Sequence, residues 1–275
     1  MRQGDGSSAG ETPESHLSRR HALRLGAATA VAAALGWSCR GAGGGAAPDS
    51  PGRLRARPAS PSGAAPAAGL TPLGLEAAGG SGARDALLYV PSGYRPDRPA
   101  PLVVMLHGAG GSARGALNPF LSRADAAGLL LLAPDSRGQT WDFIRGPYGP
   151  DVTFMDRALR DVFGRCAVDP ARVAIEGFSD GASYALSLGL TNGDLFGRIV
   201  AFSPCIVAPA AYLGRPRVFV SHGTDDPVLP IEGCGRRIAA QLRAEGYAVE
   251  YREFDGGHTV PAEIARGAID GLASA

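Results

Sequence analysis

The feature that most constrains the fold is an alternation of short apolar runs with longer amphipathic stretches, which begins near residue 70 and continues to the C-terminus. The apolar runs are continuous and do not alternate with polar positions. Such runs are typical of strands that are buried on both faces of a mostly parallel sheet. We therefore predict strands at residues 86–90, 102–106, 129–133, 172–176, 198–202, 217–221 and 249–254.

The amphipathic stretches between these runs predict helices at residues 152–163, 180–190, 234–245 and 262–272. The second of them begins with Asp180, and an acidic residue is favourable at the positive end of a helix dipole. Strands that alternate with helices imply βαβ units with right-handed crossovers, in which the helices flank a central sheet. Because ligands bind beyond the carboxyl ends of the strands in such a sheet, we expect the functional residues there.

Residues 177–181 read Gly-Phe-Ser-Asp-Gly and fit the G-x-S-x-G nucleophile elbow. This motif places serine on a strained turn between a strand and a helix, and its glycines let neighbouring backbone approach closely. A second match at residues 6–10 has no predicted strand before it and no predicted helix after it. Ser179 has both, so we predict Ser179 as the nucleophile.

A neutral serine hydroxyl is a weak nucleophile and needs a base that a carboxylate orients. Behind this elbow the partners follow in the order acid, then histidine. Residues 222–228 (His-Gly-Thr-Asp-Asp-Pro-Val) follow one predicted strand, and residues 256–261 (Gly-Gly-His-Thr-Val-Pro) follow the last one. His258 is the histidine that comes after these acids, so we predict it as the base; the alternative is a polar residue of a turn.

Four ordered motifs together resemble the phospholipase/carboxylesterase group of α/β-hydrolases: residues 106–111 (Leu-His-Gly-Ala-Gly-Gly), the elbow, residues 222–228 and Gly257-His258. They are also similar to the related polyester-depolymerase and feruloyl-esterase lipoproteins. The resemblance covers about residues 86–260. It implies the α/β-hydrolase fold and hydrolysis of carboxylic esters by a Ser-Asp-His triad, without a cofactor or metal. Residues 203–216 leave too little chain for a cap domain, so we expect an open site.

The resemblance also implies individual roles. In that group the acid is the aspartate three places after the glycine of His-Gly, which is Asp226 here; Asp225 is the fallback, and Asp255 is a weaker competitor. Two backbone N–H groups should stabilise the oxyanion. One belongs to Asp180, which follows the nucleophile at the start of its helix. The resemblance places the other at Ala109.

Three further side chains lie close to these motifs. Trp141, in the loop after Asp135, either forms a wall of the substrate pocket or anchors the loop, and the sequence leaves both open. We expect His107 and His222 to brace loops by hydrogen bonds rather than to transfer protons.

Residues 1–39 are predicted to be an export signal, because Arg19 and Arg20 precede a short apolar run without charge. The paired arginines resemble a twin-arginine signal; a general secretory signal, or an alanine-rich stretch with chance arginines, is the alternative. Cys39 and the small residues after it resemble a bacterial lipoprotein junction, although Gly36 stands where leucine is usual. We expect the protein to be exported, as a periplasmic, secreted or lipid-anchored protein.

Residues 40–69 are rich in Gly, Ala and Pro and predict a flexible linker, which leaves residues 70–275 as the catalytic domain. The formal charge of +1 gives no indication of nucleic-acid binding, so we expect a small-molecule or lipid ester as the substrate. The domain holds three cysteines, which allow one disulfide and one free thiol, and their spacing does not choose the pair: Cys166, Cys205 and Cys234.

Two rival functions remain open at this point, and so does the oligomeric state. A thioesterase or a peptidase would keep the fold and change the leaving group. A surface-attached binding protein on an inactive hydrolase scaffold would be expected to lose the serine, the acid or the histidine, and this chain retains all three.

Overall fold

The computed structural model describes Met1, residues 50–75 and residues 84–273. The predicted export signal, Cys39 and the first part of the predicted linker lie outside the described residues. None of the described helices has both the length and the apolar character that a membrane span requires.

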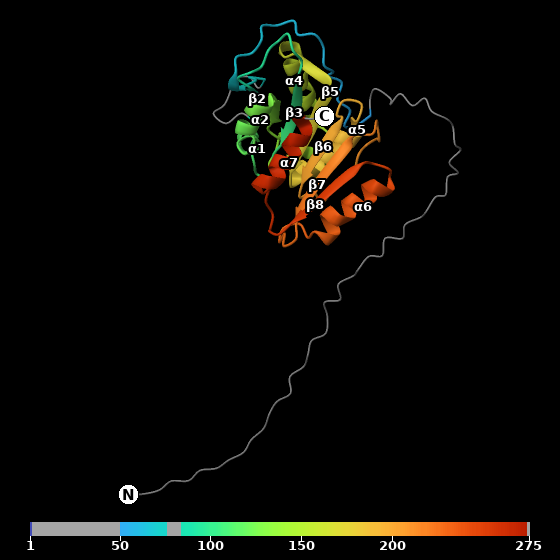
Figure 1. Ribbon diagram of the computed structural model, residues 1–275. Coiled ribbons are helices and arrows are strands. Elements are labelled where there is room, and N and C mark those ends of the chain that lie inside the picture. Colours follow the sequence, from blue (N-terminus) through green and yellow to red (C-terminus); the bar gives the residue numbers. More distant parts are fainter. Residues whose placement is uncertain (2–49, 76–83, 274–275) are drawn as a thin grey trace, which may run out of the picture. The chain divides into compact units, whose positions relative to one another are not determined.

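The described residues form a single sheet of eight strands in the order β1-β2-β4-β3-β5-β6-β7-β8 (Figure 1). Six of the strands, β3 to β8, run parallel, while β2 pairs antiparallel with both β1 and β4. The strands are β1 (Gly69–Pro72), β2 (Ala86–Val90), β3 (Ala100–Leu106), β4 (Leu130–Pro134), β5 (Val168–Phe178), β6 (Arg198–Phe202), β7 (Arg217–Gly223) and β8 (Val249–Phe254). The predicted mostly parallel sheet is confirmed, and β1 is an addition to it.

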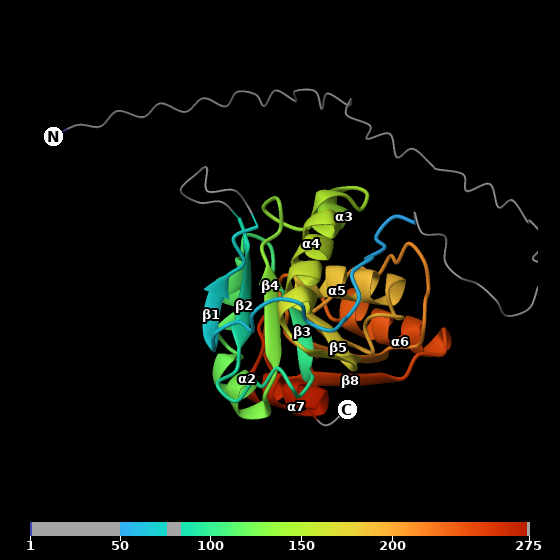
Figure 2. The same ribbon diagram turned by 90° about the horizontal axis from the view of Figure 1, so that it is seen from above.

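Helices cover both faces of this sheet (Figure 2). One layer contains α4, α5 and α6, and the other contains α1, α2 and α7. The helical segments are α1 (Ala113–Leu117), α2 (Leu121–Ala127), α3 (Asp142–Arg145), α4 (Pro150–Arg165), α5 (Asp180–Thr191), the π-helical turn η1 (Glu232–Arg236), α6 (Arg237–Ala244) and α7 (Ala262–Ala273). All four predicted helices are present, although the first turn of the third is the π-helical η1.

The central strands are mainly apolar because they supply side chains to both layers. In β3, Leu102 and Leu106 pack into the cluster that contains α4 and α5, whereas Val103 and Met105 pack into the cluster that contains α1 and α7. Successive side chains of a strand point to opposite faces, so a strand between two helical layers has no polar face. At β8 the prediction of burial on both faces is wrong, because this edge strand alternates between half-buried and exposed residues.

The prediction of a flexible linker is wrong for residues 52–57, which pack against the folded domain. Leu54 is 1% exposed and belongs to the core cluster on the α4 side of the sheet. The Asn192 side chain accepts a hydrogen bond from the Leu54 amide at 2.9 Å and donates one to the Gly52 carbonyl at 2.8 Å. Arg53 forms a salt bridge with Asp194 at 2.7 Å. The folded part of the chain therefore includes residues that composition alone assigned to a linker.

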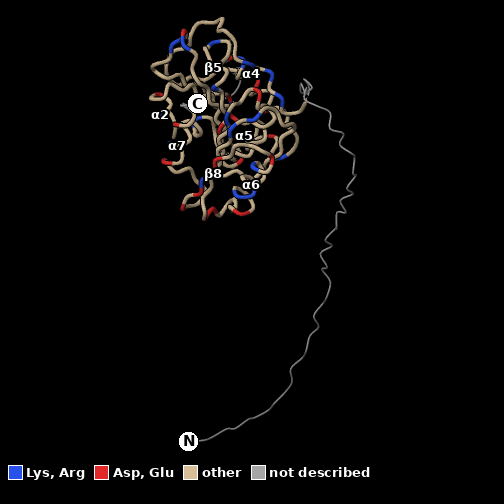
Figure 3. The backbone as a smooth tube through the Cα atoms, turned by 45° about the vertical axis from the view of Figure 1, so that its right-hand side comes forward, with Lys and Arg blue, Asp and Glu red and all other residues tan. Residues whose placement is uncertain are grey.

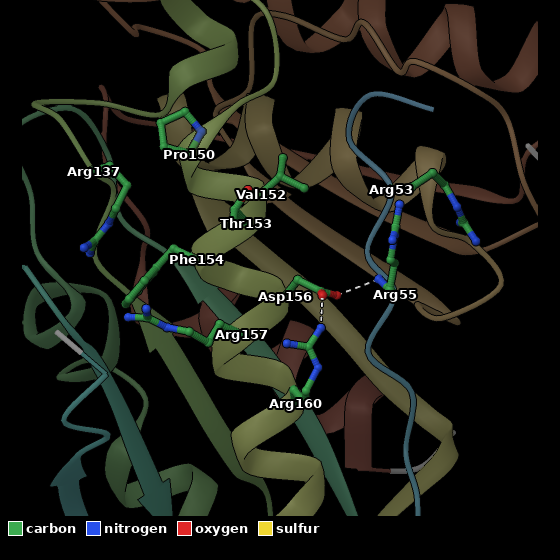
Figure 4. A pocket seen from close by; sticks show the side chains of 10 residues that line it. All are labelled: Arg53, Arg55, Arg137, Pro150, Val152, Thr153, Phe154, Asp156, Arg157 and Arg160. Atoms are coloured by element: carbon green, nitrogen blue, oxygen red, sulfur yellow. Dashed lines mark hydrogen bonds and ion pairs between the residues drawn. The ribbon is translucent and has the colours of Figure 1, made fainter. Parts of the chain in front are cut away.

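The same segment lies beside basic positions along α4, which Figure 3 shows in blue. Asp156 on α4 accepts hydrogen bonds from the amides of Arg55 and Ala56, and its second carboxylate oxygen pairs with Arg160 (Figure 4). Five arginines, Asp156 and the Phe154 ring line a hollow of about 700 Å³ here. Asp156 thus attaches the N-terminal segment to α4 and offsets part of the positive charge.

We predict that Leu54→Ala lowers the free energy of unfolding by about 2–4 kcal/mol, because it leaves a cavity in the core. Chemical denaturation of the full chain measures this. Ile206→Ala, at a side chain that is 41% exposed, is the control and should change stability by no more than about 0.5 kcal/mol. Equal small effects of both substitutions would show that the segment is not part of the cooperative fold.

Candidate active site

Ser179 occupies a strained turn between β5 and α5. Its φ of 57° lies in the left-handed region, which non-glycine residues rarely adopt. A Cβ atom on Gly177 would lie 2.2 Å from the carbonyl oxygen of Gly181, and one on Gly181 would lie 2.3 Å from that of Leu106. Both glycines of the motif are therefore required, because they let α5 start directly against β5 and the end of β3.

The structure brings Ser179, His258 and Asp226 into one hydrogen-bonded chain. These residues follow β5, β8 and β7, whose carboxyl ends lie at the same edge of the sheet. The distance from Ser179 Oγ to His258 Nε2 is 2.8 Å, and that from His258 Nδ1 to Asp226 Oδ2 is 2.7 Å. A carboxylate can only accept, so His258 Nδ1–H donates to Asp226 and Nε2 is left to accept from the serine hydroxyl.

The Asp226 carboxylate is buried and held by its own loop. Its Oδ1 accepts the amide N–H groups of Val228 at 2.9 Å and Leu229 at 2.8 Å. Burial by itself would raise the pKa of Asp226, but these donors and His258 outweigh that effect and hold the pKa below its ordinary value. Asp225 and Asp255, the alternatives for the acid, are both exposed, and Asp226 is the aspartate bonded to His258.

The two other histidines near the site brace loops. His222 Nε2–H donates to the Leu229 carbonyl at 2.8 Å, which supports the loop that carries Asp226. A Cβ on Gly235 would lie 2.6 Å from His222 Nδ1, so the glycine of the π-helical turn leaves space for this ring. His107 accepts the Ser136 amide at Nε2 and donates from Nδ1 to the Gly108 carbonyl, while burial lowers its pKa.

The glycine-rich turn after β3 lies directly beside the nucleophile. A Cβ on Gly108 would lie 3.4 Å from Ser179 Cβ, which places the neighbouring Ala109 next to the serine. The amide of Gly110 donates to the Gln139 carbonyl at 2.7 Å and fixes the turn. Asp180 is the first residue of α5, where amide groups have no partner within the helix. Its carboxylate accepts a hydrogen bond from Thr140 Oγ1 at 2.6 Å, so this side chain connects the helix to a neighbouring loop.

For Trp141 the structure favours the loop-anchoring alternative over the pocket wall. The side chain is 1% exposed and therefore has almost no surface to offer a substrate. Its indole N–H donates to the His107 carbonyl at 2.9 Å, and its ring stacks on Tyr184 with 5.0 Å between the ring centres.

A disulfide that the sequence could not assign joins two loops near the site. Cys205, in the loop after β6, is bonded to Cys234 in η1, which follows the Asp226 loop. Cys166 is the free thiol of the described residues; it is buried, and burial raises its pKa to about 11. Among the described residues no group of three or more His, Cys, Asp or Glu side chains could hold a metal ion.

Solved structures share this arrangement of sheet and helices. Esterase PE8, known from a crystal structure, is 26% identical in sequence to this chain and superposes with a TM-score of 0.54 over 64% of this chain and 96% of that one. The chain has the α/β-hydrolase fold. A family model described as Phospholipase/Carboxylesterase matches residues 155–269, a segment that contains Ser179, Asp226 and His258.

Parts of the chain are also similar to two curated proteins. Feruloyl esterase C of Emericella nidulans is 30% identical over 164 residues, which are 54% of this chain and 57% of that protein. Acyl-protein thioesterase 1 of Gibberella zeae is 32% identical over 106 residues, which are 34% of this chain and 45% of that protein. The chain thus spans little more than half the length of the first of these relatives and less than half of the second.

Sequence reasoning missed one ionisable residue beside the site. Glu176 on β5 is 4% exposed and lines a pocket of about 280 Å³ next to the turn that carries Ala109. Burial raises the pKa of Glu176 well above its ordinary value of 4.5. The sequence does contain an indication of this site, because an acidic residue inside a predicted buried strand conflicts with the apolar pattern around it.

We predict that Glu176→Gln raises the melting temperature, and that the gain grows as the pH rises above about 4.5. Between this pH and the raised pKa of the folded state, the unfolded chain releases the Glu176 proton more readily than the folded protein does, so the contribution of Glu176 to stability falls with increasing pH. Glutamine does not titrate. Differential scanning calorimetry at several pH values measures the difference. Glu250→Gln, at an exposed position of β8, is the control and should show no such trend.

Proposed function

We propose that this chain hydrolyses carboxylic esters through an acyl-enzyme intermediate on Ser179. The observation that carries the proposal is the hydrogen-bonded chain from Ser179 Oγ through His258 to Asp226, with distances of 2.8 and 2.7 Å. This arrangement activates a serine hydroxyl as a nucleophile. The likeness to esterases and to a thioesterase supports the same reaction class.

In the proposed first step, Ser179 Oγ attacks the ester carbonyl carbon while His258 Nε2 takes the hydroxyl proton. The resulting imidazolium is stabilised by Asp226, and the amide N–H groups of Ala109 and Asp180 hold the oxyanion. His258 then gives its proton to the departing alcohol, which leaves Ser179 acylated. In the second step a water molecule attacks the acyl carbonyl carbon while His258 takes a proton from it. His258 then returns this proton to Ser179 Oγ as the acid is released. Neither step needs a metal ion or a cofactor.

A thioesterase activity on the same triad is the second candidate. The similarity to an acyl-protein thioesterase favours it, and the chemistry differs only in the leaving group. Paired oxygen and thiol esters of the same acyl group separate the two, because the ratio of their kcat/KM values reports the preferred leaving group.

Ser179→Ala is expected to lower kcat for a chromogenic ester by about 10⁴-fold or more. Asp226→Asn should lower it by a similar order, because an amide no longer favours the required histidine tautomer. The matched control is Ser92→Ala, at an exposed serine that is hydrogen-bonded to Asp125, and it should retain wild-type activity. A fluorophosphonate probe gives an independent readout. Wild-type protein that is folded and not labelled at Ser179 would overturn the enzyme proposal in favour of a binding protein.

We propose further that the chain is exported and that its substrate is a small-molecule or lipid ester. The basic and apolar order of residues 18–35 supports export, and the small residues after Cys39 support a lipid-modified N-terminus. Mass spectrometry of the mature N-terminus in a bacterial host tests both proposals. A diacylglyceryl mass on Cys39 supports the tether, and an uncleaved N-terminus argues against export.

A further inference from the structure

Glu176 places a carboxyl group in a pocket whose other lining is mainly apolar. The pocket has a volume of about 280 Å³, and it lies against the turn after β3, sharing Gly108, Ala109 and Phe178 with the surroundings of the nucleophile. Its apolar lining comes from β3, α1, the segment after α1, the elbow and the loop after His258: Leu106, Ala116, Pro119, Phe120, Phe178 and Val260.

Glu176 reaches this pocket because of the register of β5. Ala174 and Phe178 belong to the cluster on the α1 and α7 side of the sheet, and the side chain between them points to the same face. Its neighbours across the sheet are Met105 on β3 and Val200 on β6, both fully buried. An apolar residue would suit this position better, since burying a polar group without a partner is unfavourable.

The carboxyl group of Glu176 has no recorded hydrogen-bond or ion-pair partner within residues 50–75 and 84–273. The other titratable side chain that lines the pocket is His107, whose ring nitrogens are already bonded to Ser136 and Gly108. With no cation facing it, burial raises the pKa of the carboxyl and favours its protonated form, which offers one O–H donor and one carbonyl acceptor. Such a group is a binding point for a ligand, because a partner would remove the penalty of leaving it unsatisfied.

We propose that this pocket binds the acyl group of the substrate ester and that Glu176 selects acyl groups with a hydroxyl at their far end. The inference rests on the proposed function. Ala109, which holds the oxyanion in that proposal, lines the pocket, so the acyl carbonyl and the pocket lie side by side. Ser179 follows Glu176 by three positions along extended backbone, a span of roughly 10 Å. An apolar acyl chain of about six atoms fits this span, and its terminal hydroxyl can both donate to and accept from the carboxyl.

The test compares two p-nitrophenyl esters that differ only at the end of the acyl chain, the 6-hydroxyhexanoate and the heptanoate. Wild-type protein should favour the hydroxylated ester in kcat/KM. In Glu176→Met that preference should fall by about 10-fold or more, because the hydroxyl loses its partner. Glu176→Gln keeps a donor and an acceptor and should retain most of the preference. Glu176→Leu also removes both groups and serves as the second variant if Glu176→Met fails to fold.

Two controls separate this inference from the proposed function. The p-nitrophenyl acetate acyl group is too short to reach Glu176, so its kcat/KM gives the reference activity of each protein, and fluorophosphonate labelling of Ser179 shows that each protein has a reactive nucleophile. Loss of acetate hydrolysis in wild type would contradict the esterase proposal itself. Glu250→Met, the same substitution at an exposed position, should leave the preference for the hydroxylated ester unchanged.

Three results would overturn the inference. One is a preference for the hydroxylated ester that is equal in wild type and Glu176→Met. Another is a wild-type preference for the 6-aminohexanoate ester over the hydroxylated one, which would show that the carboxyl selects a cation. The last is a preference for a hydroxyl on the alcohol group of the ester, and not on its acyl group, that is lost in Glu176→Met; it would show that the pocket binds the alcohol group.

Discussion

The whole site depends on one close approach of backbone. The first turn of α5 touches the ends of β5 and β3, and only glycine at positions 177 and 181 permits that contact. This approach holds Ser179 in a left-handed backbone conformation, in which its hydroxyl is bonded to His258. The strain is sustained because the helix and the strands on both sides are buried and fix the turn.

The remaining groups reach Ser179 because the strands are parallel. Strands that run in one direction bring their following loops to one edge, so residues far apart in the chain converge there. Asp226 and His258 follow the neighbouring strands β7 and β8, so their side chains come within hydrogen-bonding distance. Further contacts fix the neighbouring segments. His222 is hydrogen-bonded to the loop that carries Asp226, Trp141 is hydrogen-bonded to His107 at the turn after β3, and a disulfide joins Cys205 to Cys234.

Glu176 differs from the residues around it. Most other buried side chains of the central strands fill the two apolar layers, whereas this carboxyl is buried, lines a pocket and has no hydrogen-bond partner among the described residues. A buried group that lowers stability is a common property of binding sites, because binding requires polar atoms that are not already satisfied within the protein. The pocket and the triad share one wall, so a single local sequence, residues 176–181, carries both the nucleophile and the proposed acyl recognition.

The sequence by itself determined the strand order along the chain, the parallel sheet, and the residues of the triad as candidates, because these follow from apolar patterning and from motifs with a fixed backbone requirement. It could not place the segment around Leu54. The amide of Leu54 is bonded to Asn192, 138 residues further along the chain, and that of Ala56 to Asp156, 100 residues further along. Nor could the sequence choose the disulfide pair or separate the two roles of Trp141. Those outcomes were decided by tertiary contacts, because they depend on which distant residues the fold brings within bonding distance.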